Sequence, residues 1–150
     1  MKVIIDSCFW FSYLQNRNAD HHEAAVRIYG FLTSIGVDFI IPFPSLYETL
    51  NTKLLKEGHR ELSRWFANQL VSNEHFMKIS DEKYRDIAFD NTVSPLNDRG
   101  ISFVDNIIRT MLKDKSAHIN ALVTFNRRDF EDICYEKGIE ILDEKFSPSF

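Results

Sequence analysis

The sequence has little cysteine: Cys8 and Cys134 are the only two among its 150 residues. Two cysteines do not make a disulfide framework, and without an export signal we expect two reduced, buried thiols. Long apolar runs are also lacking, since none approaches the roughly 18 residues of a membrane span, and the first residues do not follow the pattern of a signal peptide. These absences exclude a disulfide-stapled scaffold and a membrane-spanning protein, and we expect a cytoplasmic chain.

An excess of positive charge is absent as well. Asp and Glu number 22 against 18 Lys and Arg, the net charge is −4, and the isoelectric point lies near 5.7. This balance argues against a general nucleic-acid coat protein, although it is compatible with a local basic rim around an acidic site. No repeat, linker or low-complexity stretch divides the chain, and 44% hydrophobic residues suffice for one core. We predict one domain over residues 1–145 and a C-terminal tail over 146–150.

Apolar strands alternate with helical segments along this domain. Val3, Ile4 and Ile5 show no polar alternation, which predicts a strand buried on both faces of a parallel sheet. Further strands are predicted over residues 39–41, 76–79, 120–124 and 139–142. Helices are predicted over residues 20–35, 45–56, 60–72, 82–89, 101–113 and 129–137. This alternation predicts a single α/β domain in which helices flank a mostly parallel sheet of about five strands.

Four acidic residues stand just beyond predicted strands or at helix starts. Asp6 directly follows the first strand, Glu48 lies one turn inside the helix after the second, Asp105 opens the helix before the fourth, and Asp129 follows the fourth. If these helices start on the same side of the sheet, the four carboxylates converge at the edge where open α/β folds place ligands. Carboxylates that share a site repel one another unless a divalent cation neutralises them. Ligation by oxygen alone suits Mg²⁺ or Mn²⁺ rather than zinc.

Helix capping is a simpler interpretation of three of these acids. Each stands three residues after a potential capping residue, in Ser45-x-x-Glu48, Ser102-x-x-Asp105 and Asn126-x-x-Asp129. Asp6 has no such alternative, because it ends a buried strand and an unpaired buried carboxylate is costly.

Three arginines lie close to these acids in the sequence. Arg127 and Arg128 flank the proposed site directly, and we weigh contact with a phosphate group of a substrate equally against a solvated position. Arg109 follows Asp105 by four residues, for which an intrahelical ion pair is the simpler prediction.

The ordered set of motifs resembles a PIN domain. The matching segments cover essentially the whole chain: Asp6-Ser7 after an apolar strand, Glu48 within Pro44–Leu50, Asp105 within Ser102–Asn106, and Leu122–Phe130. PIN domains are metal-dependent ribonucleases, and they include the toxins of bacterial toxin–antitoxin pairs. The resemblance therefore implies an RNA substrate, water activated by Mg²⁺ or Mn²⁺, and an antitoxin as a possible partner.

The resemblance also implies roles for individual residues. The family's three core metal-binding and catalytic acids match Asp6, Glu48 and Asp105. In the family, the fourth acid often follows a threonine by two positions. Here that position, two residues after Thr124, is Asn126, and the nearest acid is Asp129. The resemblance therefore implies that Asn126 or Asp129 completes the site. The hydroxyls of Ser7 and Thr124 match those that the family commonly places beside the metal.

Other functions fit less of the sequence. An RNA-processing nuclease outside any toxin–antitoxin pair would use the same site. A phosphoacceptor signalling domain of flavodoxin-like fold needs paired acids after the first strand and an aspartate after the third, whereas Asp6 is single and Ile79-Ser80 ends the third strand. In a non-catalytic interaction module the acids would be helix caps only.

Phenylalanine is unusually frequent, with thirteen residues in the chain. This is more than a core of this size needs, so we expect some exposed rings, with candidates around Phe31, Phe66 and Phe89. Exposed apolar patches usually mark interaction surfaces, and we therefore predict a homodimer and a peptide partner.

Overall fold

Five short parallel strands form the centre of the molecule. The computed structural model describes residues 1–14, 20–50 and 60–148. The strands are β1 (Lys2–Ile5), β2 (Asp38–Pro42), β3 (Phe76–Ile79), β4 (Ala121–Val123) and β5 (Glu140–Leu142), in the spatial order β3-β2-β1-β4-β5. Every neighbouring pair is parallel, and Ile4 of β1 is in register with Ile40 on one side and Leu122 on the other. The predicted α/β fold and all five predicted strands are confirmed.

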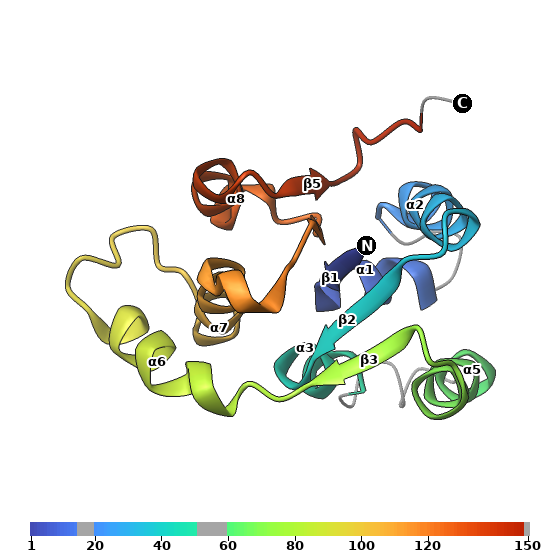
Figure 1. Cartoon of the computed structure of the whole chain (residues 1–150), viewed down its shortest axis with the longest axis horizontal. Helices are drawn as coiled ribbons and strands as arrows, with labels where there is room; N and C mark the ends of the chain where they lie inside the picture. Colours follow the sequence, from blue (N-terminus) through green and yellow to red (C-terminus); the bar gives the residue numbers. More distant parts are fainter. Residues whose placement is uncertain (15–19, 51–59, 149–150) are drawn as a thin grey trace.

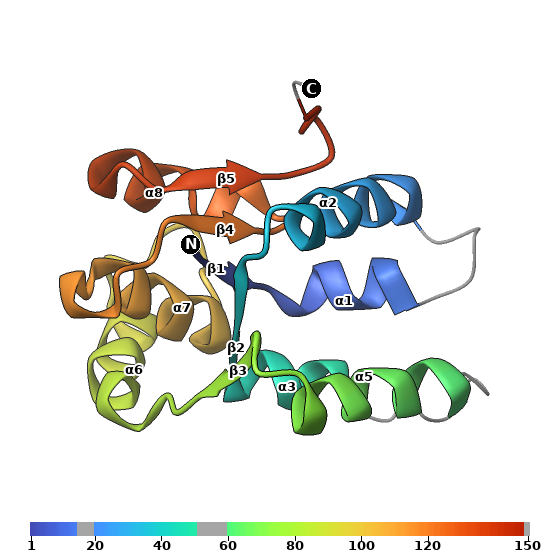
Figure 2. The same cartoon turned by 45° about the vertical axis from the view of Figure 1, so that its right-hand side comes forward.

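Helices cover both faces of this sheet, as Figures 1 and 2 show. One face carries α1 (Ser7–Leu14), α2 (His22–Ser34), α3 (Phe43–Thr49) and α5 (Arg60–Ser72), and the other carries α6 (Arg85–Val93), α7 (Phe103–Lys113) and α8 (Glu131–Lys137). Three single 3₁₀ turns complete the description: η1 (Glu82–Tyr84), η2 (Lys115–Ala117) and η3 (Arg127–Asp129). None of the helices in the described ranges is both long and apolar enough to cross a membrane.

The sheet separates two apolar cores, because side chains alternate along a strand. Val3 and Ile5 of β1 belong to the core beneath α1, α2, α3 and α5, where Trp10 and Phe66 are fully buried. Ile4 points the other way and belongs to the core beneath α6, α7 and α8. This explains why the first strand shows no polar alternation: both of its faces are covered.

Several helix boundaries differ from those predicted. The helix predicted from Ser45 begins two residues earlier, at Phe43, because Pro42 takes the extended backbone of an N-cap and Pro44 suits the first turn. The rest of that prediction, residues 51–56, lies outside the described residues. The segment predicted as a helix over 82–89 is divided into η1 and α6, and the helix predicted over 129–137 begins only at Glu131 after η3.

The three phenylalanines proposed as exposed have different environments. Phe89 is 54% exposed, as predicted, whereas the prediction for Phe66 is wrong, since its side chain is fully buried. Phe31 is half-buried and packs on Phe146, with ring centroids 5.0 Å apart. Arg27 donates a hydrogen bond to the carbonyl oxygen of Phe146 at 2.9 Å, so the first residue of the predicted tail contacts α2.

Candidate active site

The first acid, Asp6, lies where β1 ends and is 4% exposed. Its Oδ1 accepts a hydrogen bond from the backbone N–H of Ser7 at 2.6 Å. Its Oδ2 accepts from the Thr124 hydroxyl at 2.8 Å and from the Cys8 thiol at 3.1 Å. These donors are all neutral, so they orient the carboxylate without compensating its charge.

The position of Asp6 follows from the order of the strands. The chain moves from β1 outward to β2 and β3, then returns to the other side of β1 to form β4 and β5. The carboxyl ends of β1 and β4 are therefore a topological switch point, the usual ligand-binding place of an open parallel sheet. Thr124 follows β4 directly, and its bond to Asp6 joins the two strand ends across this point.

Glu48 approaches Asp6 from α3 through a shared hydroxyl. The Ser7 hydroxyl donates to Glu48 Oε2 at 2.5 Å and lies 3.4 Å from Asp6 Oδ1, so it stands between the two carboxylates. Burial and, to a smaller extent, the charge of Asp6 raise the pKa of Glu48, against the opposing effect of the Ser7 hydrogen bond. The capping interpretation of Glu48 is wrong, because α3 starts before Ser45 and the buried Ser45 hydroxyl has no hydrogen-bond partner within the described residues.

Asp105 reaches the same region from the first turn of α7. Ser102 is the N-cap of this helix, since its hydroxyl accepts from the backbone N–H of Asp105 at 3.1 Å and donates to Asp105 Oδ2 at 2.8 Å. Burial raises the pKa of Asp105 to about 6, assisted by the charges of Asp6, Asp129 and Glu48. The Ser102 hydrogen bond acts in the opposite direction. The carboxyl of Asp105 thus responds to all three of the other predicted site acids.

Asp129, on η3, is held by Asn126. The Asn126 side-chain amide donates to Asp129 Oδ2 at 2.7 Å, while its backbone N–H donates to the Thr124 hydroxyl at 3.0 Å. The Asn126 side chain makes no capping hydrogen bond. The two candidates for the fourth position are therefore hydrogen-bonded to each other, and which of them binds a cation stays a prediction.

The four site acids are buried or half-buried, yet within the described ranges no cation lies beside them. Asp81, Asp114, Asp132 and Asp143 each form an ion pair with an arginine or lysine side chain at 2.6–2.9 Å. None of the ion pairs found within the described ranges involves the carboxylates of the four predicted site acids, Asp6, Glu48, Asp105 and Asp129. The folded chain places the four acids within electrostatic reach of Asp105 and, in the described part, leaves their charge uncompensated by its own side chains.

The four acids and the hydroxyls of Ser7 and Thr124 provide only oxygen atoms as metal ligands. Such a set of ligands suits a hard divalent cation. In the described ranges, no three Asp, Glu, His or Cys side chains are close enough together to form a preassembled metal site. Hydrogen bonds from Ser7, Ser102 and Asn126 hold Glu48, Asp105 and Asp129 in their present orientations. The chemistry of the donors fits Mg²⁺ or Mn²⁺, and the carboxylates would exchange these hydrogen bonds for the cation.

Two arginines make contacts other than those predicted. The intrahelical pair of Arg109 with Asp105 is wrong: Arg109 forms a two-point ion pair with Asp132 of α8 at 2.6 and 2.8 Å. Arg127 binds the buried Asp143 beyond β5 at 2.7 Å while its side chain stays 48% exposed, and its contact with RNA stays a prediction. Its neighbour Arg128 is exposed, and its contact with RNA stays a prediction.

Cys8 is predicted from the sequence only as a buried thiol, yet it belongs to the site. Besides donating to Asp6, its sulfur accepts from the backbone N–H of Phe125 at 3.3 Å. Burial and, to a smaller extent, the charge of Asp6 raise the pKa of the thiol well above its usual range. The group therefore stays protonated and acts as a donor. Cys8 and Cys134 are both free thiols, as predicted, but only Cys134 is buried and Cys8 is half-buried. The position of Cys8, two residues after Asp6 in the first turn of α1, is the only sequence signal of its role.

The pKa of Asp105 leads to a prediction about the metal-free protein. A folded-state pKa of about 6, above the ordinary 3.8, means that the folded protein binds this proton more tightly than the unfolded chain. The resulting stabilisation is complete below pH of about 4 and is lost as the pH rises through about 6. Between pH 4 and pH 8 the free energy of unfolding of Asp105→Asn should therefore rise by about 1 kcal/mol relative to that of the wild type. This value is reduced for partial solvent screening. Urea unfolding of both proteins in chelator across this range measures the difference, and a constant difference would contradict the assigned pKa.

Two comparisons of the sequence with known proteins find no relative. A scan against models of protein families gives no match, and a search of curated proteins finds no similar sequence.

Proposed function

We propose that this protein is a metal-dependent ribonuclease that hydrolyses phosphodiester bonds of RNA at Asp6, Glu48, Asp105 and Asp129. One observation carries the proposal: four carboxylates from separate segments lie around the switch point of a parallel sheet, and burial, together with the charges of Asp6, Asp129 and Glu48, raises the pKa of the fourth, Asp105. None of the four takes part in an ion pair within the described residues. Such a group stores repulsion that a divalent cation would relieve. The resemblance to PIN domains extends the proposal to a cytoplasmic toxin paired with an antitoxin, or alternatively to an RNA-processing nuclease outside such a pair.

Asp6, Glu48 and Asp105 would hold the ion, with Asp129 or Asn126 completing the site. When bound, Mg²⁺ or Mn²⁺ supplies a nucleophile from water at neutral pH and neutralises charge that develops on the phosphate. The contribution of the chain is positional. Thr124 and Cys8 direct one oxygen of Asp6, and Ser7 sets the separation between Asp6 and Glu48.

The strand order weighs against the phosphoacceptor alternative. In a flavodoxin-like sheet the third strand lies directly beside the first, in the order 2-1-3-4-5. Here β4 takes that place and β3 lies at the edge, beyond β2. Incubation with acetyl phosphate followed by mass measurement would test this alternative directly.

The proposal predicts cleavage of single-stranded RNA by the purified protein with Mg²⁺ or Mn²⁺, and none in excess chelator. The products should carry 5′-phosphate and 3′-hydroxyl ends, because water rather than the ribose 2′-hydroxyl attacks the phosphorus. Analysis of the product ends by mass spectrometry distinguishes the two routes. Asp6→Asn, purified in the same way, serves as the control for contaminating nucleases and should lose activity by orders of magnitude. Cleavage that persists in chelator, cyclic-phosphate ends, or equal activity of Asp6→Asn would each overturn the proposal.

A further inference from the structure

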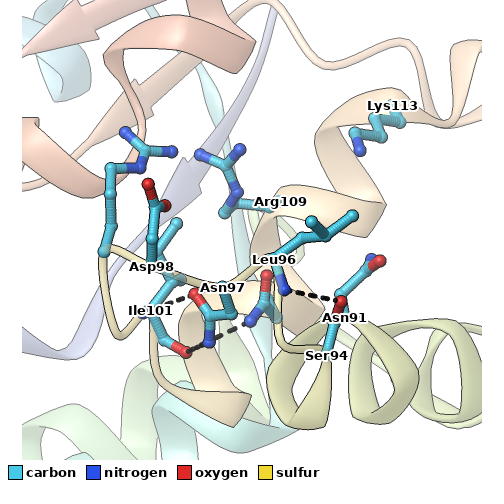
Figure 3. Close-up of a pocket in the computed structure, with 10 residues that line it drawn as sticks. Asn91, Ser94, Leu96, Asn97, Asp98, Ile101, Arg109 and Lys113 are labelled. Carbon is cyan, nitrogen blue, oxygen red and sulfur yellow. Dashed lines mark hydrogen bonds between the residues drawn. The ribbon is translucent and has the colours of Figure 1, made fainter.

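A polar pocket lies between the C-terminal half of α6, the segment 94–102 and α7, the helix that carries Asp105 (Figure 3). Its volume is 340 Å³, and most of the side chains that line it are polar. The Asn97 side chain holds one wall of the pocket in place. Its amide donates to the carbonyls of Thr92 and Ile101, both at 3.0 Å, and its oxygen accepts from the Ile101 N–H at 2.9 Å. Asn106 also donates to the Ile101 carbonyl, at 3.2 Å. The pocket wall is therefore held by a network of hydrogen bonds.

Cations outnumber acids around this pocket. Arg99, Arg109 and Lys113 line it together with one acid, Asp98. Arg99 and Arg109 both bind Asp132, at 2.9 and 2.6 Å, so a single carboxylate serves two guanidinium groups. The side chains that line the pocket thus carry three positive charges and one negative charge, and Asp132, which lies outside the lining, compensates one further positive charge. This local balance contrasts with the net charge of −4 of the whole chain.

Helix α7 connects the pocket with the acidic site, because it carries residues of both. Asp105, Arg109 and Lys113 follow one another at intervals of four residues, so they lie along one side of this helix. Arg109 also donates to the backbone carbonyl of Asp129 at 2.5 Å, which ties the pocket to the fourth site acid. Eight residues of helix span about 12 Å, a distance that an RNA strand covers in a few nucleotides.

We infer that this pocket binds a backbone phosphate of the RNA strand whose scissile phosphate lies at the Asp6, Glu48 and Asp105 carboxylates. The inference rests on the proposed function and adds to it a second point of contact with the substrate. Guanidinium and ammonium groups are the usual partners of phosphate oxygens. Four acids without ion pairs in the described part of the chain repel RNA when no cation is bound, and the Arg99, Arg109 and Lys113 group offers the adjacent attraction.

Binding of a fluorescent single-stranded RNA to the full chain in chelator tests the pocket without cleavage. Lys113→Glu should weaken binding by about fivefold or more, and the slope of the salt dependence should fall by about 0.7, because one phosphate fewer is neutralised. Asp98→Asn should instead strengthen binding, a gain that damage to the fold would not produce. The matched controls are Lys115→Glu and Asp86→Asn, exposed residues outside the pocket whose effects should stay within about twofold.

The outcomes separate this inference from the proposed function. If Lys113→Glu and Asp98→Asn bind RNA like the wild type, the pocket assignment is wrong even where metal-dependent cleavage is observed. If both variants shift binding as expected while the metal-loaded wild type cleaves no RNA, the pocket stands and the nuclease proposal fails. A parallel titration with inorganic phosphate covers the other source of the ligand: phosphate binding that Lys113→Glu removes, with RNA binding unchanged, would overturn the RNA assignment. Unfolding temperatures of all four variants show whether weaker binding reflects a damaged fold.

Discussion

Replacing Asp105 with asparagine should reduce metal-dependent RNA cleavage by about a thousandfold or more, since one of the carboxylates that would hold the cation is removed. The same substitution should remove most of the stabilisation that Mn²⁺ gives by binding only the folded protein, which amounts to about 2.7 kcal/mol at a hundred times the dissociation constant. Cleavage rates and thermal unfolding, each with chelator and with Mn²⁺, measure the two effects on the same samples.

The hydrogen bonds around Asp105 make this test decisive. If the carboxylate served only to cap α7, Asp105→Asn would cost about 0.5–1 kcal/mol and leave activity unchanged. The cap, however, is the Ser102 hydroxyl, which accepts from the backbone N–H of residue 105, and asparagine keeps that N–H. We therefore expect the helix to survive the substitution while the cation site does not.

Asp86→Asn is the matched control, because Asp86 is an exposed acid in the first turn of α6. It should retain both the cleavage rate and the Mn²⁺ shift. If Asp105→Asn behaves like this control, Asp105 does not bind the cation and the proposed site is wrong.

Truncating Phe66 should have a larger effect on folding than any of the other substitutions, with a loss of about 3–5 kcal/mol in the free energy of unfolding. The Phe66 ring is fully buried and lies 4.6 Å from the ring of Trp10, measured between centroids. Alanine would leave a cavity between α5 and α1, where neither the sheet nor the helices can easily collapse. Urea unfolding followed by circular dichroism gives the difference.

Phe89→Ala removes the same ring from a position that is 54% exposed and should change stability by less than about 1 kcal/mol. The comparison holds the chemistry constant and varies only burial. Equal effects of the two substitutions would mean that α5 does not pack on α1 as the structure has it.

Some features of this protein follow from local sequence patterns alone. The run Val3–Ile5 without polar alternation predicts a doubly covered strand, and the structure confirms it because a strand with two apolar faces has no stable place at a surface. The same reasoning places Asp6 at the carboxyl end of this strand, because a charged side chain ends the apolar run that the core can cover. Parallel pairing then follows from the alternation of strands with helices.

Other features depend on competition between partners far apart in the chain. Arg109 has Asp105 one turn away, yet it binds Asp132, because the packing of α7 on α8 presents a carboxylate in two-point geometry with a backbone carbonyl alongside. Phe66 looks like an exposed ring on a helix of mixed composition, and only the position of Trp10 shows which side of α5 is buried. No local pattern encodes either contact.

The sequence by itself thus determined the α/β fold, the strand positions and the acids at the carboxyl edge of the sheet, because these depend on the hydrophobic period and on where each apolar run stops. The tertiary structure alone decided that the Cys8 thiol helps to orient Asp6, and it alone paired Arg127 with Asp143. It also assembled the pocket of Arg99, Arg109 and Lys113. The physical reason is that burial patterns are repeated over many residues and tolerate error, whereas a hydrogen bond or ion pair is made by two side chains whose proximity depends on how whole helices pack.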